Sequence, residues 1–363
     1  MRRIQRYFIL LCTIPVPLFL YISYNPRLCC SAESESNKRW FFIDSMNSLA
    51  LQFYVHKDSS ERVEVNVLPQ TNVNKSFQIN HKTAKKTVQR MCNRHKRIPH
   101  SLKSLTKKQR RITLSHLIVN DEYKFIYCYT PKVACSNWKR IMKVLYGQIE
   151  LAENIQHIDH AHGFKYLSNY PESEMEEKLK TYYKFMFVRN PLERALSVYR
   201  NKFNDIETFR LLYGSEIARM MHHDSEEQYR GKSPGDDISF VDFIKYITFG
   251  VEVTEMNEHW TPMSTLCQPC AISYDFIGTY DNIEKESEMV LRAIHAPPDL
   301  HFPQRQKWYN PTTNKYMEYY FSLLQPALLR NFALKYFADF KLFSYPLPIN
   351  VTSRSELGHV PQN

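Results

Sequence analysis

The sequence is poor in glycine and has none of the glycine-rich loops that hold nucleotide phosphates in many enzymes. Only 8 of its 363 residues are glycine, and the pattern GxxxxGK(S/T), whose backbone N–H groups surround a triphosphate, does not occur. The carboxylates are not clustered in the way that would hold a metal ion. A nucleotide kinase would need both features, so this class is disfavoured, and we expect no metal requirement.

An uncharged, mostly apolar run lies near the N-terminus. Arg2, Arg3 and Arg6 precede residues 7–24, which reach about the minimum length for a membrane span. A cleaved signal peptide would look similar, but no small-x-small cleavage site follows and Arg27 flanks the far side, so we favour a retained signal anchor. With residues 1–6 as a cytoplasmic tail, the rest of the chain faces the lumen, as in a type II membrane protein of the secretory pathway.

Cysteine usage agrees with an oxidising lumen. Cys267 and Cys270 form a CxxC pair, but neither a second CxxC nor an HxxxH lies nearby to complete a zinc site. We expect structural disulfides among the eight cysteines, and their spacing does not define which of them pair. Cys29 and Cys30, just outside the predicted span, are candidates to cross-link two chains into a homodimer.

No acidic residue occurs between His81 and Arg111, where the chain concentrates its positive charge. This segment holds twelve of the 48 lysines and arginines, and without it 36 basic residues face 37 acidic ones. We interpret residues 25–112 as a polar lumenal stem that includes this basic segment, 81–111. Such blocks bind acidic polysaccharide, anionic lipid or nucleic acid, of which nucleic acid does not fit a lumen. A solvated linker without a specific partner is the alternative.

A strand-to-helix turn follows the stem. Residues 125–129 are apolar, aromatic and β-branched, as in a buried strand, and residues 138–145 repeat apolar side chains at helical spacing. Ser136 is placed to cap the helix, and the helix N-terminus with donors from Lys132 and Asn137 suits a phosphate or sulfate. An ordinary connection with a surface lysine is the alternative. The residues of this first turn are Pro131, Lys132, Val133, Ala134, Cys135, Ser136 and Asn137.

A second turn of the same kind comes later. Residues 184–188 form an apolar strand, after which Asn190 can cap a helix and Pro191 can take its first position. With Arg200 nearby, this turn is a plausible cradle for a second phosphate, although a helix with a solvated basic face would look similar. Its residues are Arg189, Asn190, Pro191, Leu192, Glu193, Arg194, Ala195, Leu196 and Ser197.

Alternating strands and helices continue through the chain and predict an α/β domain with a parallel sheet flanked by helices. Further strands are expected at 114–119 and 274–278. Helices are expected at 171–180, at 240–249 and from Pro326 to about Tyr336. No internal repeat is visible. We place the catalytic domain at 113–348 and a C-terminal tail at 349–363.

The two turns together resemble the cofactor motifs of Golgi carbohydrate sulfotransferases, in the branch of the chondroitin/dermatan and N-acetylgalactosamine 4-O-sulfotransferases. The resemblance extends from Leu114 to Pro348 and includes Glu258-His259-Trp260. It implies a nucleotide-kinase-like (P-loop-like) fold that binds 3′-phosphoadenosine 5′-phosphosulfate, with residues 131–137 around the 5′-phosphosulfate and residues 189–197 on the 3′-phosphate. Asn190 departs from the family, which usually has Asp or Glu there to orient the preceding arginine.

The resemblance also implies the reaction, which is sulfate transfer to a sugar hydroxyl in the Golgi lumen. The acceptor that the resemblance favours is O4 of N-acetylgalactosamine in chondroitin or dermatan. N-acetylgalactosamine on N-glycans and terminal glucuronic acid are alternatives, so the partner is a glycosaminoglycan or glycoprotein glycan and not nucleic acid. A lumenal glycan-binding protein that uses only the basic segment is the non-enzyme alternative.

Catalysis requires positive charge on the leaving phosphate oxygen and a base for the sugar hydroxyl. Lys132 is placed to supply the charge. For the base, the resemblance favours His157, with His160 second, in the loop after the first cofactor helix. Glu258 and His259 are rivals, since a carboxylate whose pKa is raised by burial could also serve.

Overall fold

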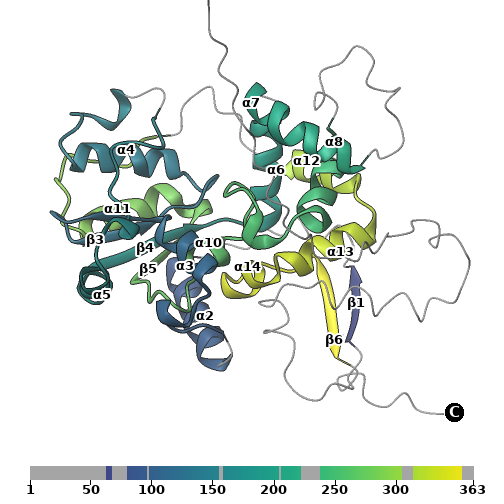
Figure 1. The fold of residues 1–363 in the computed structure, drawn as a ribbon, viewed down its shortest axis with the longest axis horizontal. Coiled ribbons are helices and arrows are strands. Elements are labelled where there is room, and N and C mark those ends of the chain that lie inside the picture. The colour runs from purple at the N-terminus through teal and green to yellow at the C-terminus, as the bar shows by residue number, and fades with distance from the viewer. Residues whose placement is uncertain are drawn as a thin grey trace, which may run out of the picture. The chain divides into compact units, whose positions relative to one another are not determined.

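The computed structural model of the chain describes residues 63–67, 80–95, 98–154, 158–203, 206–221, 238–304 and 314–353 (Figure 1). All of them belong to one compact unit, Met46–Asn363. The predicted cytoplasmic tail, membrane anchor and much of the stem lie outside the described residues, as do Cys29, Cys30 and His157. Among the helices in these ranges, none combines the length and apolar character needed to cross a membrane.

A four-stranded sheet forms the centre of the unit, in the order β2-β3-β4-β5. Strands β3, β4 and β5 are parallel, whereas β2 runs antiparallel to β3. The prediction of a purely parallel sheet is therefore wrong at one edge. The reason is the short connection at residues 121–124, since a parallel pair needs a long crossover. The strands are β2 Leu117–Asn120, β3 Phe125–Cys128, β4 Tyr183–Val188 and β5 Phe276–Thr279.

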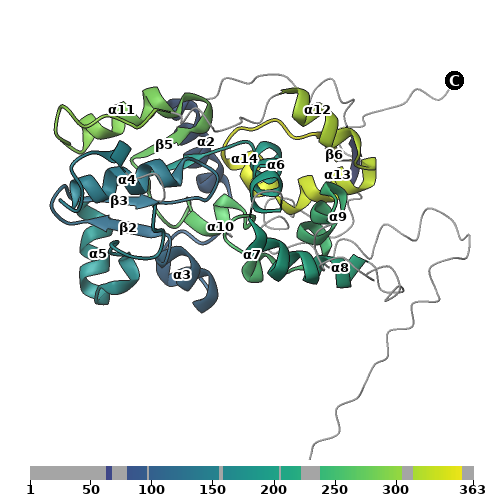
Figure 2. The ribbon, with the colours of Figure 1, turned by 90° about the horizontal axis from the view of Figure 1, so that it is seen from above.

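The two parallel crossovers bring the predicted turns to one edge of the sheet. Strand β3 leads into helix α4, Cys135–Leu145, and β4 leads into helix α6, Pro191–Lys202. Because β3 and β4 are parallel neighbours, their carboxyl ends lie together, and both turns follow these ends. Figure 2 shows the same arrangement from above.

Successive side chains of β3 point to opposite faces of the sheet, and each contacts a helix that packs on its face. The Tyr127 ring lies 5.6 Å from that of Trp138 on α4. The next residue, Cys128, points to the opposite face and forms a disulfide with Cys267 of helix α10, Met263–Cys267. The end of β3 is therefore anchored on both sides immediately before the first turn.

The helices expected near 171–180, 240–249 and 326–336 are present as α5, as α9 with η8, and as α13, and the other remaining elements were not predicted. Together these elements are β1 Val63–Val67, α2 His81–Arg94, η3 Leu102–Ser104, α3 Lys107–Leu114, η4 Ala152–Asn154, η5 Leu167–Asn169, α5 Glu172–Thr181, α7 Glu207–Phe209, η6 Arg210–Gly214, α8 Ser215–Met221, α9 Phe240–Lys245, η8 Tyr246–Gly250, η9 Val253–Glu255, η10 Tyr280–Asn282, α11 Ile283–Ala293, α12 Asn314–Ser322, α13 Pro326–Lys335, α14 Phe337–Leu342 and β6 Ile349–Ser353. Strands β1 and β6 form a separate antiparallel pair.

The expected disulfides are present, and each cysteine of the CxxC pair bonds to a distant partner. Cys267 pairs with Cys128, and Cys270 pairs with Cys92 on α2. Ala84 and Val88 of α2 are also buried in the main core. The predicted boundary at residue 113 therefore falls inside the folded unit, because the apolar stripe and the cysteine of α2 attach this part of the basic segment to the domain.

The basic residues of helices α2 and α3 differ in the ion pairs that they form. On α3 and just before it, Lys103, Lys108 and Arg110 form ion pairs with glutamates. On α2, four exposed cations repeat every four residues along one face, and none has an ion pair within the described ranges. They are Lys82, Lys86, Arg90 and Arg94.

Candidate active site

The first turn has an unusual backbone. Lys132 and Ala134 have left-handed backbone conformations, with φ of 70° and 55°. Ala134 is the N-cap of α4, so the helix begins at Cys135 and Ser136 falls inside it. The prediction that Ser136 caps the helix is therefore wrong, and no side chain caps this N-terminus. Left-handed residues next to a helix N-terminus turn backbone N–H groups toward one point, which is the geometry that binds anions.

The side chains of the first turn are held by neighbouring elements. Lys132 Nζ donates a hydrogen bond to Asn201 Oδ1 at 2.9 Å. Asn137 donates to the carbonyl of Pro303 and accepts from Arg140. Pro131 and Val133 are buried, and the other five residues of the turn are half-buried. Cys135 carries a free thiol, the pKa of which is raised by burial.

The second turn has the predicted cap. Asn190 Oδ1 accepts from the backbone N–H of Leu192 at 2.9 Å, and Pro191 occupies the first helical position. Arg189 is buried, and its Nε lies 3.3 Å from Glu193 Oε2. Glu193 thus supplies a carboxylate beside Arg189 in place of the acidic residue that the family usually has at position 190.

Two buried arginines join the turns to each other and to a third segment. Arg189 donates to the carbonyl of Lys132 at 3.2 Å, and its guanidinium stacks 4.0 Å from the Tyr280 ring. Arg194 donates to the carbonyls of Pro131, Glu258 and Thr261 at 3.0, 2.9 and 2.6 Å. Ser197 is buried one helical turn beyond Arg194, and Leu192, Ala195 and Leu196 pack in the core.

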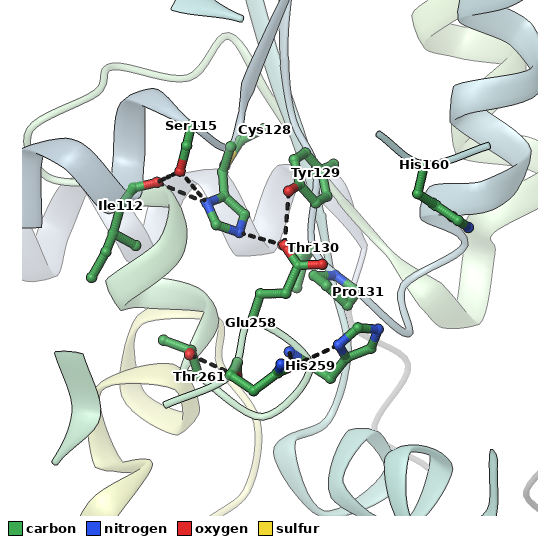
Figure 3. Close-up of polar contacts among 12 residues, drawn as sticks. Ile112, Ser115, Cys128, Tyr129, Thr130, Pro131, His160, Glu258, His259 and Thr261 are labelled. Atoms are coloured by element: carbon green, nitrogen blue, oxygen red, sulfur yellow. Dashed lines mark hydrogen bonds and ion pairs between the residues drawn. The ribbon is translucent and has the colours of Figure 1, made fainter. Parts of the chain in front are cut away.

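Glu258 lies next to the first turn in a network of donors (Figure 3). Its Oε2 accepts from the Tyr129 hydroxyl at 2.8 Å and lies 3.2 Å from His116 Nε2. His116 Nδ1 faces the Ile112 carbonyl at 2.7 Å, so Nδ1 must carry a proton. Burial alone would raise the pKa of Glu258, but His116, His259 and Tyr129 lower it to about 2.

The neighbouring His259 is oriented by an amide. Asn257 Oδ1 accepts from the backbone N–H of His259 at 3.0 Å and lies 2.7 Å from its Nδ1. The Asn257 amide nitrogen donates to the Tyr213 hydroxyl at 2.7 Å. Burial and then the charge of Lys202 lower the pKa of His259 to about 3, so the ring is neutral near neutral pH.

His160, in the loop after α4, is more weakly held than His259. His160 Nε2 lies 3.4 Å from the Ser136 hydroxyl, and the His160 carbonyl accepts from Lys139. Partial burial and then the charge of Lys139 lower the pKa of His160 to about 4, although the side chain keeps contact with solvent. Of the two predicted bases, only His160 is therefore placed beside the first turn, since His157 lies outside the described residues.

The structure adds residues that the motifs did not point to. His116 directly precedes β2 and Tyr129 directly follows β3, so both lie at the open end of the hairpin, where their rings stack 4.6 Å apart; Asn201 comes from α6. For the third segment, which contains Glu258 and Thr261, the signal in the sequence was the polar triplet Asn257-Glu258-His259. Within the described part of the chain, no group of three or more His, Cys, Asp or Glu could hold a metal ion.

Comparisons with known proteins agree with this arrangement. A model of the sulfotransferase family matches residues 115–346. Carbohydrate sulfotransferase 14 from Danio rerio is 43% identical over 267 residues, which are 74% of this chain and 72% of that protein. The human protein of the same name is 45% identical over 251 residues, 68% of this chain and 64% of its own length.

A more distant relative matches a similar share of the chain. Carbohydrate sulfotransferase 11 from Rattus norvegicus is 35% identical over 258 residues, 68% of this chain and 72% of the relative. The search of the solved structures found no match. The family resemblance seen in the two turns is confirmed: the chain belongs to the sulfotransferase family and is a sulfotransferase.

Proposed function

We propose that the chain transfers sulfate from 3′-phosphoadenosine 5′-phosphosulfate to a hydroxyl of a carbohydrate, on a nucleotide-kinase-like fold. The observation that carries this proposal is the first turn, where two left-handed residues precede an uncapped helix of eleven residues. Such a turn presents backbone donors and the positive end of the helix dipole to one anionic group. Family membership supports the proposal that this group is the phosphosulfate of the donor.

The residues around the turn fit the donor. When bound, the donor supplies an activated sulfate on a phosphate leaving group. Lys132 is half-buried at the turn, and its ammonium is held by Asn201 through one neutral hydrogen bond. An anionic oxygen forms a stronger hydrogen bond with an ammonium than a neutral amide does. Lys132 can therefore exchange Asn201 for the leaving phosphate oxygen and neutralise the charge that develops there.

The second turn supplies the site for the 3′-phosphate in this proposal, through Arg189 and Ser197. Both side chains are buried at the start of α6, next to the first turn. The distance between the turns is set by Arg189 and Arg194, which donate to carbonyls of Lys132 and Pro131. This link supports a single donor that spans both turns.

For the acceptor, we infer O4 of N-acetylgalactosamine in chondroitin or dermatan. Support comes from the resemblance of the turns to the 4-O-sulfotransferase branch and from similarity to proteins named carbohydrate sulfotransferase 14 and 11. N-acetylgalactosamine on N-glycans and terminal glucuronic acid are the alternatives. His157 and His160 are carried forward as candidate bases, and a Golgi membrane location through residues 7–24 belongs to the same proposal.

The test is sulfate transfer by the full-length chain from the labelled donor. Acceptors would be desulfated chondroitin, desulfated dermatan, an N-glycan ending in N-acetylgalactosamine and a glycan ending in glucuronic acid, followed by disaccharide analysis. We expect label on O4 of N-acetylgalactosamine in the polysaccharides. Polysaccharide binding without transfer and without binding of adenosine 3′,5′-bisphosphate would support the glycan-binding alternative instead.

A further inference from the structure

The geometry around His259 defines which of its ring nitrogens can accept a proton. The backbone N–H of His259 points at Asn257 Oδ1, and a backbone N–H needs an acceptor, so this atom is the amide oxygen. The same oxygen lies 2.7 Å from His259 Nδ1, which must therefore be the protonated nitrogen. The neutral ring carries its lone pair on Nε2, and in the ranges described no residue is hydrogen-bonded to that atom.

The orientation of this ring is itself supported. Asn257 is held by the Tyr213 hydroxyl, and the edge of the Phe209 ring packs against His259 with centroids 5.2 Å apart. An amide that holds one imidazole nitrogen while the other points away is the arrangement of an oriented general base. His160 has no such partner on its Nδ1 among the residues that the structure covers, and it retains more contact with solvent.

Arg194 places His259 beside the first turn. Its guanidinium binds the carbonyl of Pro131 on one side and the carbonyl of Glu258, the residue before His259, on another. A second connection runs through α6, where Lys202 lies 4.2 Å from the Phe209 ring and the adjacent Asn201 holds Lys132. Figure 3 shows His259 and Pro131 in this common region.

We propose that His259 is the base that accepts the proton of the acceptor hydroxyl, with Asn257 as its positioning residue. This inference rests on the proposed function. The hydroxyl oxygen forms a bond to sulfur while the bond from sulfur to the bridging phosphate oxygen breaks, and the electron pair of that bond remains on the phosphate. The hydroxyl proton moves to His259 Nε2 and is later released to solvent.

The charges that face His259 explain how a weakly basic ring serves in this role. Burial and the cations Lys202, Lys132 and Arg194 lower its pKa, whereas Glu258 raises it. Among the described residues, Phe209 packs against His259, and Tyr213 holds Asn257. The anionic donor would neutralise Lys132 and Lys202, so His259 becomes more basic once the donor is bound. His259 is then more basic when the donor nucleotide is bound than in the free chain.

The experiment compares His259→Ala, Asn257→Ala and His160→Ala in the full-length chain. We expect kcat to fall by about 10² or more in His259→Ala, with binding of adenosine 3′,5′-bisphosphate retained and activity partly restored by added imidazole. Asn257→Ala should lose about tenfold in kcat with little change in the acceptor KM. His160→Ala tests the rival base, and His162→Ala is the control: the exposed His162 lies in the same loop with its Nδ1 2.8 Å from Asp159 Oδ2, and this variant should keep more than about a tenth of wild-type kcat.

A spectroscopic measurement separates a base from a structural histidine. In the wild-type chain, the pKa of His259 followed by NMR should rise when adenosine 3′,5′-bisphosphate is added. The inference is overturned if His259→Ala keeps more than about a tenth of kcat, or if imidazole restores His160→Ala and not His259→Ala. If His259→Ala does not fold, Asn257→Ala and the NMR titration decide, and an unchanged pKa overturns it. Absence of transfer in the wild type would instead reject the proposed function.

Discussion

The two strand-to-helix turns have the same topology and opposite construction. In the first, left-handed Lys132 and Ala134 open helix α4 with no side-chain cap. In the second, Asn190 caps α6 with its own side chain and Pro191 takes the first helical position. The first turn leaves donors available to an anion, whereas the second satisfies one of its donors internally and has none on Pro191.

The side chains show the same division. The functional groups of the first turn are half-buried and face the site, whereas Arg189 and Arg194 of the second are almost fully buried and donate to carbonyls of the first. The two copies of this motif therefore differ in role: the first is proposed to bind the anion, and the second also holds the first in shape. Each of the following variants tests this division, in order of expected effect.

Arg194→Ala should have the largest effect, on stability. It leaves three buried carbonyls without a donor, at about 1–3 kcal/mol each, so the free energy of unfolding should fall by about 3 kcal/mol or more. Chemical denaturation measures this. Arg200→Ala on the same helix is the control: Arg200 is half-buried over the Tyr316 ring, and we expect a loss below about 1 kcal/mol. If both variants lost the same free energy of unfolding, Arg194 would have no special supporting role.

Lys132→Ala should reduce turnover and leave stability unchanged. A neutral hydrogen bond such as that from Lys132 to Asn201 contributes little to folding, whereas the charge of Lys132 is proposed to stabilise the leaving oxygen. We expect kcat to fall more than tenfold, which corresponds to over ~1.4 kcal/mol. Lys143→Ala, later in α4, provides the comparison and should keep its turnover. Turnover of Lys132→Ala above about a tenth of wild type would contradict the assigned role.

Arg189→Ala and Ser197→Ala should weaken nucleotide binding more than turnover at saturating donor. Loss of a charge-assisted phosphate contact costs about 1.5–3 kcal/mol, and loss of a hydroxyl contact costs less. Titration with adenosine 3′,5′-bisphosphate should therefore show at least a tenfold rise in Kd for Arg189→Ala and a smaller one for Ser197→Ala. Unchanged dissociation constants would leave the second turn as a purely structural support.

Ala134→Gly should have the smallest effect, in the opposite direction. A left-handed conformation costs an L-residue about 1 kcal/mol and costs glycine almost nothing, so this variant should be slightly more stable. Ala134→Val should be destabilised, because a branched side chain tolerates positive φ poorly. Thermal unfolding of the two variants measures the strain directly. A valine variant as stable as the glycine variant would show that the turn is not constrained.

Local sequence patterns determined much of the secondary structure of this protein. Apolar runs and helical spacing placed β3, α4, β4 and α6, and Asn190 with Pro191 marked the start of α6 correctly. These features depend on neighbouring residues, whose preferences can be read in order along the chain. The two turns and the family they resemble were visible for the same reason.

Contacts between distant residues were decided only by the tertiary structure. Cys128 and Cys267 are separated by 139 positions, and Tyr129 and Glu258 by 129. No periodicity links such pairs, because packing of the sheet against its helices brings them together. The antiparallel edge strand, the buried role of Arg194 and the orientation of His259 by Asn257 also depend on this packing. The sequence therefore marked the two turns that we propose bind the donor, and the fold selected the side chains that surround them.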